Sequence, residues 1–260
     1  MSEPLLVDAS RATGNYALDL SRETGRMAIM LARTFKGAAG MDRDEFFKHL
    51  YRMAFKSLPI VIVTALFTGA IMVVQAGVTV RRLQAEGLLG WGAGFSTIRE
   101  IAPLLTALMM SGRIGANNTA ELGTMVVTEQ LDALRVLAID PIKFLVAPRF
   151  FAIVITVVSM TIFADALSLF GAAYTGLGLL GVEPMTFYNS LTGGMIRVGD
   201  LMNGIVKSAA FGGVIALSSC HYGITTTGGS PGVGRSVNAT VVMSAAGVFV
   251  LDYFVSFLLP

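Results

Sequence analysis

Residues 57–80 read SLPIVIVTALFTGAIMVVQAGVTV and carry no charged side chain. An α-helix rises about 1.5 Å per residue, so a helix over this stretch is about 36 Å long. The hydrocarbon core of a bilayer is about 30 Å thick, and an uncharged run of this length is typical of a transmembrane helix. The stretch therefore predicts that the chain crosses a membrane at least once.

The composition of the whole chain points the same way. Of its 260 residues, 54% are hydrophobic and only 14% are charged, whereas soluble domains carry about 25% charged residues. The net charge of +2 gives no reason to expect a nucleic-acid partner. One cysteine and two histidines argue against a metal site, and no nucleophile–base pair or carboxylate pair suggests an enzyme.

Four further stretches are predicted to span the membrane. They lie near residues 91–120, 144–176, 201–221 and 236–258. We therefore predict an all-α, polytopic membrane helix bundle with about five transmembrane helices over residues 57–260.

Residues 1–56 have a different character. They mix basic and acidic residues and lack the apolar core of a signal peptide, which predicts a cytoplasmic segment. Within it, Lys48, Arg52 and Lys56 form a basic stripe opposite an apolar face. Such a helix beside a span is typical of the membrane interface, and the alternative is a helix packed on a partner protein.

Residues 121–143 are too charged to span a membrane. A short helix is predicted near residues 128–139, ended by Asp140 and Pro141, with Leu131, Leu134 and Ala138 as its apolar stripe. With the N-terminus inside, nine Lys and Arg residues near the spans lie inside and four outside. The positive-inside rule therefore predicts a cytoplasmic N-terminus and short helix, and, with five spans, an external C-terminus.

Two segments resemble phosphate-binding motifs. Residues 229–236 read GSPGVGRS, close to a P-loop but with Arg235 in place of the lysine, and residues 176–181 read GLGLLG. Neither lies between a strand and a helix, as nucleotide binding requires. We read the first as a tight loop before the last span and the second as a helix end. ATP hydrolysis and cofactor binding are therefore not expected in this chain.

Charges inside predicted spans cost several kcal/mol each and normally face a partner or a cavity. We expect a charge-neutralising network, rather than a proton relay, made of Arg113, Glu121, Asp165, Lys207 and Asp252. For Arg99 and Glu100 two interpretations stay open: they line a pocket, or they form a structural pair that locks spans together.

An ordered set of short motifs covers residues 97–149. It comprises REIAP at 99–103, SGRIG at 111–115, AELG at 120–123, TEQLDAL at 128–134, IDP at 139–141 and Pro148-Arg149. This set resembles the MlaE/YrbE permease family, the membrane subunits of MCE-associated lipid ABC transporters. Weaker similarity extends over residues 57–260.

The resemblance implies a multi-pass permease subunit in the cell inner membrane, with a periplasmic C-terminus. It implies a homodimer, two cytoplasmic ABC ATPase subunits that bind ATP and magnesium, an MCE-domain protein on the periplasmic side, and a lipid cargo, often a phospholipid. The residues implied for ATPase coupling are Glu129, Gln130, Leu131, Ala133 and Leu134. Those implied for the lipid cavity are Val74, Gln75, Val78, Arg99, Glu100 and Leu104.

Two other functions stay open on the residues alone. An ion-coupled secondary transporter could use Glu100, Asp165, Lys207 and Asp252, although no internal repeat is visible. A membrane scaffold that transports nothing is the other alternative.

Overall fold

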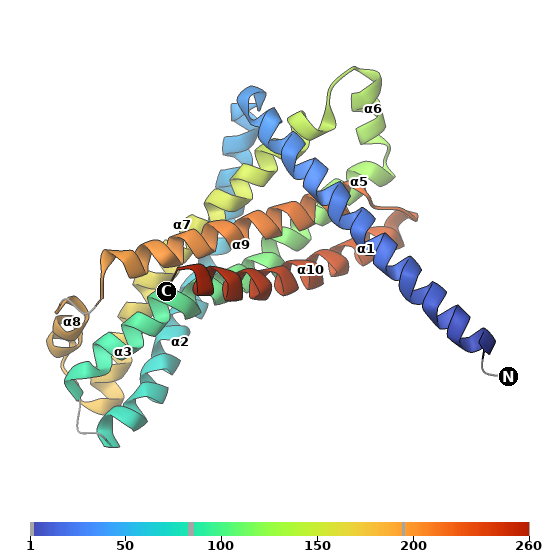
Figure 1. Cartoon of the computed structure of the whole chain (residues 1–260). Helices are drawn as coiled ribbons and strands as arrows, with labels where there is room; N and C mark the ends of the chain where they lie inside the picture. The colour runs from blue at the N-terminus through green and yellow to red at the C-terminus, as the bar shows by residue number, and fades with distance from the viewer. Residues whose placement is uncertain (1–2, 83–85, 194–195, 260) are drawn as a thin grey trace.

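The computed structural model describes residues 3–82, 86–193 and 196–259, and this part of the chain contains helices and no strand (Figure 1). The sequence predicts two parts, residues 1–56 and residues 57–260, and the outer ends of these parts, residues 1 and 260, lie outside the described residues. The α-helices are α1 (Glu3–Gly37), α2 (Arg43–Arg82), α3 (Leu89–Ser96), α4 (Ala102–Met110), α5 (Ala116–Val127), α6 (Gln130–Val136), α7 (Ala147–Thr175), α8 (Pro184–Thr192), α9 (Val198–Ile224) and α10 (Gly229–Leu258).

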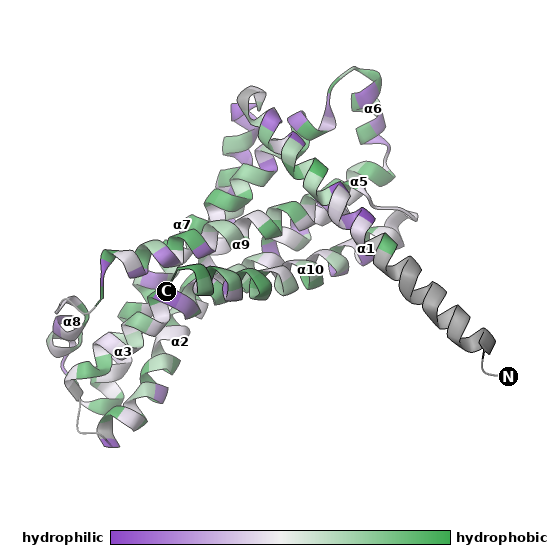
Figure 2. Ribbon diagram, viewed as in Figure 1, coloured by the Kyte–Doolittle hydropathy of each residue, from purple (hydrophilic) through white to green (hydrophobic). Residues whose placement is uncertain are grey.

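Four helical stretches in the described residues are long and apolar enough to cross a membrane. They are Arg43–Val80, Ile142–Leu180, Val198–Ile224 and Gly229–Leu258. They contain the first, third, fourth and fifth predicted spans, and hydrophobic residues dominate much of their length in Figure 2. The prediction of an all-α membrane bundle is confirmed.

The predicted second span is helical but less apolar than the other four. It is a continuous run from Leu89 to Val127, in which π-helical turns at Thr97–Ile101 and Ser111–Gly115 join α3, α4 and α5. The run packs against α7, α9 and α10, so it lies among the four apolar helices. Its charged residues explain why length and composition alone indicate four spans, not five. Both π turns carry charges, Arg99 and Glu100 in the first and Arg113 in the second.

The predicted interfacial stretch is not a separate helix. Residues 46–56 form the first turns of α2, which continues without interruption into the first span. Pro59 lies two residues into that span and cannot donate a backbone hydrogen bond to the carbonyl four residues earlier. The two parts of α2 therefore meet near a weak point of the helix, and the interfacial position of the first part stays a prediction.

Two local predictions need correction. Residues 229–236 are not a loop but the first turns of α10, because positive φ angles at Gly228 and Gly229 complete the reversal of the chain at the first residue of that segment. The predicted short helix is α6, which begins at Gln130 and ends at Val136; Ala138 is exposed, with a φ of 59°, and does not belong to its apolar stripe.

Close packing of α2 on α7 organises the apolar core. A Cβ atom on Gly69 would overlap the backbone carbonyl of Ser168, and one on Gly171 would overlap that of Leu66. Glycine at these positions lets the two backbones approach, as small residues do in membrane bundles. Buried side chains of α2, α7 and α9, among them Val61, Phe150 and Phe211, belong to the main apolar core cluster.

We predict that Gly69→Ala lowers the thermal unfolding midpoint of the detergent-solubilised protein. Overpacking of a close contact costs about 1–3 kcal/mol, because a backbone has to move. Gly213→Ala is the matched control, since a Cβ there meets nothing within 4 Å. It is expected to be neutral or stabilising by up to about 1 kcal/mol. Equal midpoints for the two variants would contradict the packing argument.

Candidate functional site

A groove of about 360 Å³ lies between α2 and α4. Its lining is almost entirely apolar and consists of Ile60, Thr64, Ala65, Phe67, Thr68, Ile71, Ala102, Leu105, Thr106, Met109, Ala164 and Ser168. The hydroxyl of Thr64 donates to the carbonyl of Ile60 at 2.8 Å, and that of Thr68 donates to the carbonyl of Thr64 at 2.7 Å. These threonines therefore present little unsatisfied polarity, and the groove suits a hydrocarbon chain.

None of the six residues predicted to line the lipid cavity lines this groove. Val74, Gln75 and Val78 are exposed and follow Ile71 by three, four and seven residues. That spacing places them on the same face of α2 as the groove, one to two turns farther along. Leu104 is half-buried on α4. Their role in binding lipid stays a prediction.

Glu100 lies instead in an ion-pair cluster around Lys207. The Lys207 side chain is only 2% exposed, and its ammonium contacts both Glu100 and, at 3.1 Å, Asp252. The hydroxyl of Ser256 donates to the second oxygen of Glu100 at 3.1 Å. This Lys207 cluster joins the first π turn to α9 and α10.

The side chain of Arg99, on the same π-helical turn, points in another direction. Its guanidinium contacts Asp200 at 3.3 Å and donates to the carbonyl of Leu259 at 3.0 Å. Because Arg99 and Glu100 both bind residues of other helices, the geometry favours the locking role among the two that the sequence left open.

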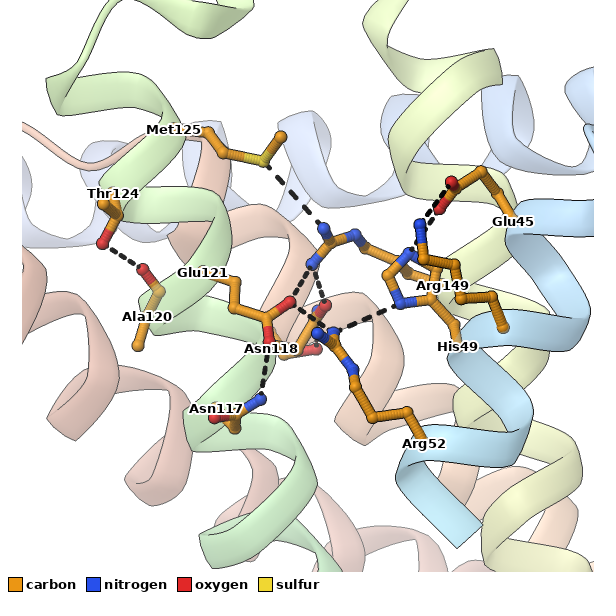
Figure 3. A network of polar contacts seen from close by, with 12 residues as sticks. Glu45, His49, Arg52, Asn117, Asn118, Ala120, Glu121, Thr124, Met125 and Arg149 are labelled. Atoms are coloured by element: carbon orange, nitrogen blue, oxygen red, sulfur yellow. Dashed lines mark hydrogen bonds and ion pairs between the residues drawn. The ribbon is translucent and has the colours of Figure 1, made fainter. Parts of the chain in front are cut away.

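A second cluster surrounds Glu121 and is shown in Figure 3. One carboxylate oxygen of Glu121 accepts from Arg52 at 2.6 Å and from Arg149 at 3.0 Å, and the other accepts from Asn117 at 3.0 Å. Arg149 is almost fully buried and also donates to Asn118 at 3.1 Å. The Glu121 cluster therefore joins α2, α5 and α7.

The structure does not bring the five residues of the predicted charge network together. Lys207 and Asp252 share one cluster, Glu121 belongs to the other, and Arg113 donates to the backbone carbonyl of Lys56. The buried carboxylate of Asp165 makes no hydrogen bond to any described residue. The structure therefore contains two separate clusters, around Lys207 and around Glu121, in place of the single predicted network.

Sequence reasoning missed the basic members of the Glu121 cluster. The sequence pattern places Arg52 on the interfacial stripe and Arg149 in the motif Pro148-Arg149, and it pairs neither residue with Glu121. The sequence feature that indicates such a residue is an arginine beside a long apolar run. An arginine in that position has to pair with a hydrogen-bond acceptor once it is buried. No three His, Cys, Asp or Glu side chains within the described ranges gather closely enough to hold a metal ion.

α6 stands apart from the long helices at one end of the bundle, hereafter the α6 end (Figure 1). Leu131 is 4% exposed and Leu134 partly buried, and both pack into a cluster with residues of α1, α5, α9 and the π-helical turn Ile142–Val146 that precedes α7. The other three residues predicted to couple to an ATPase, Glu129, Gln130 and Ala133, are exposed. The helix is thus anchored by its leucines, and its outward surface mixes polar residues with the exposed Ala133 and Val136.

The family model described as Permease MlaE matches residues 46–258, which is most of the chain. The chain belongs to the MlaE permease family. The matched region begins in the first turns of α2 and ends at the last residue of α10, so it includes the groove, both charge clusters and α6.

Relatives are found in distant bacteria. The chain is 35% identical over 212 residues to a probable ABC transporter permease protein of Rickettsia typhi, which covers 82% of both chains. It is 36% identical over 204 residues to another of Synechocystis, covering 78% of this chain and 77% of the relative. It is 31% identical over 209 residues to the intermembrane phospholipid transport system permease protein MlaE of Haemophilus influenzae, covering 80% of both.

We predict that Glu121→Gln destabilises this MlaE-family protein, because Arg149 then stays buried without a carboxylate. Removing one partner of a buried ion pair costs about 3–5 kcal/mol, and partial exposure of Glu121 favours the low end. Asp132→Asn is the control, since its pair with Arg135 is exposed and worth at most about 0.5 kcal/mol. Thermal unfolding in detergent measures both, and a control as destabilised as Glu121→Gln would contradict the assignment.

Proposed function

We propose that this protein is the membrane subunit of an ATP-driven transporter that moves lipid, with phospholipid as the cargo. Membership of the MlaE permease family and the phospholipid named for the Haemophilus influenzae relative support the cargo. The observation that carries the proposal is α6, a short exposed helix at the end of the bundle that only two leucines anchor. Such a helix offers a docking surface through which a separate ATPase subunit can move the bundle.

The packing of α6 explains how a displacement of this helix would be transmitted to the membrane spans. Leu131 and Leu134 contact a cluster that contains Leu122 of α5, Val146 at the start of the third span and Cys220 of α9. Packed cores move as units rather than deforming continuously, so a shift of α6 displaces these helices together. The Glu121 cluster extends the displacement to α2, one wall of the groove.

The groove between α2 and α4 is proposed as the site for an acyl chain of the cargo. Val74, Gln75 and Val78 continue the same face of α2 toward the opposite end, where α8 lies. Gln75 offers a polar group on this face to a lipid headgroup. Together with Leu104, these residues are proposed as the part of the path nearest the periplasm, and Arg99 and Glu100 are proposed to hold the helices around it through their ion pairs.

The remaining partners follow from the same proposal. The subunit is proposed to act as a homodimer in the inner membrane, with its N-terminus cytoplasmic and its C-terminus periplasmic. Two ATPase subunits bind ATP and magnesium and dock on α6, and an MCE-domain protein receives or delivers lipid on the periplasmic side. The excess of Lys and Arg on the α6 side of the predicted spans supports this orientation.

Neither alternative function gains support from the geometry. Glu100 and Asp252 both pair with Lys207, as expected of a structural cluster, and the described residues form no chain of carboxylates across the bundle. Transport by this chain alone, driven by a proton gradient, would establish the secondary transporter instead.

We predict that Glu129→Lys uncouples transport. Glu129 is exposed immediately before α6, so charge reversal changes the docking surface without disturbing the core. Its backbone is left-handed, with a φ of 60°, and glutamate and lysine must adopt this same conformation, so the substitution changes only the charge. Lipid transfer by proteoliposomes containing the chain and its ATPase should fall about tenfold or more while the dimer persists. Glu183→Lys, an exposed change at the α8 end, is the control. Wild-type transfer by Glu129→Lys would refute the docking role.

A second prediction concerns the groove. Thr68→Trp should occupy it and lower lipid transfer about tenfold, equivalent to about 1.4 kcal/mol of lost binding. Ile62→Trp adds the same ring to the opposite face of α2 and should transfer lipid like the wild type. The groove assignment fails if the two variants behave alike.

A further inference from the structure

A second, polar pocket of about 280 Å³ lies at the α6 end of the groove. It is formed by the first part of α2 and by the helical run that faces it, and its lining residues are Arg52, Met53, Lys56, Ser57, Arg113, Ile114, Asn117 and Glu121. Three cationic side chains and one carboxylate therefore surround the same space.

The charges in this pocket do not balance. Glu121 is already shared between Arg52 and the buried Arg149, so its negative charge is matched twice. No carboxylate in the part of the chain that the structure describes pairs with Lys56 or Arg113. Arg113 donates to a backbone carbonyl, that of Lys56, which leaves its positive charge uncompensated.

The pocket and the groove follow one another along the same two helices. On α2, Met53 and Ser57 line the pocket and Ile60 and Thr64 line the groove, at spacings of three and four residues. Residues at these spacings share one face of a helix. On the facing run, Arg113 belongs to the pocket and Met109, one turn away, to the groove.

We propose that this pocket binds a phosphate group through Lys56 and Arg113, and that the phosphate belongs to a lipid whose acyl chain lies in the adjoining groove. Guanidinium and ammonium groups are the natural partners of phosphate oxygens, and neither group here has a competing anion. The proposal rests on the proposed function and specifies its substrate: a phosphate-bearing lipid, taken from the leaflet at the α6 end.

The adjoining groove favours a lipid over free phosphate as the source. An apolar groove continues directly from the two cations, so one amphiphile can satisfy both surfaces at once. Inorganic phosphate would leave the groove empty. Basic side chains at a membrane surface also attract anionic lipids by about 1 kcal/mol each, which concentrates such lipids at this site.

The test uses the purified full-length chain in a neutral detergent and three probes: dioctanoyl phosphatidic acid, dioctanoylglycerol and sodium phosphate. We expect the wild type to bind phosphatidic acid at least tenfold more tightly than the uncharged diacylglycerol. The Lys56→Gln/Arg113→Gln double variant should lose that preference. Arg33→Gln/Arg82→Gln, which removes two exposed positive charges elsewhere, should retain it.

Each outcome decides the question. Equal loss in both double variants means a non-specific charge effect and overturns the site. Competition by sodium phosphate at the affinity of phosphatidic acid supports a phosphate site but overturns the lipid as its source. If the double variant does not yield a monodisperse protein, Lys56→Gln alone, with an exposed ammonium, should weaken phosphatidic acid binding severalfold, and unchanged binding refutes the proposal.

Binding by the isolated chain needs neither ATPase nor transport, so the inference and the proposed function fail separately. Retained phosphatidic acid preference without any ATP-driven transfer would refute the function alone. Wild-type transfer of phospholipid by the Lys56→Gln/Arg113→Gln variant would show that this pocket is not on the transport path, while leaving the function intact.

Discussion

The cost of an unpaired charge away from water shapes this bundle more than any other interaction. Lys207 places an ammonium among helices where it is almost completely buried, and two carboxylates from different helices surround it. Breaking such a cluster costs about 3–5 kcal/mol, which is a large part of the 5–15 kcal/mol that typically separates a folded protein from its unfolded chain. The clusters at Lys207 and Glu121 therefore set which helices must lie together.

This constraint gives the helical run from Leu89 to Val127 its central place. The run supplies the acidic residue of the Glu121 cluster and one of the two carboxylates that surround Lys207. The run contains two π-helical turns, and each of them carries charged residues. Such turns often occur at functional sites. Here they separate the groove from the two ends of the bundle.

The same physical argument links the groove to the polar pocket beside it. Where a charge has a partner, it locks helices; where it has none and faces an open pocket, it is available to a ligand. Glu121 and Lys56 lie around one pocket and illustrate the two cases, since the carboxylate is matched twice and the ammonium not at all. On the proposed function, the bundle thus combines a locked frame with a site for an amphiphile.

Much of this architecture was already determined by the sequence alone. Long uncharged runs have to be buried in lipid, so residues 57–80 and the later apolar stretches define the spans, and the charged residues before Asp140-Pro141 define α6. Only the tertiary structure decided which charges meet. Arg52 reaches Glu121 across 69 residues, while Asp165 meets no hydrogen-bond partner among the described residues, because ion pairing depends on distances in space that helical periodicity does not encode. Periodicity gives the face of a helix; packing alone determines what that face contacts.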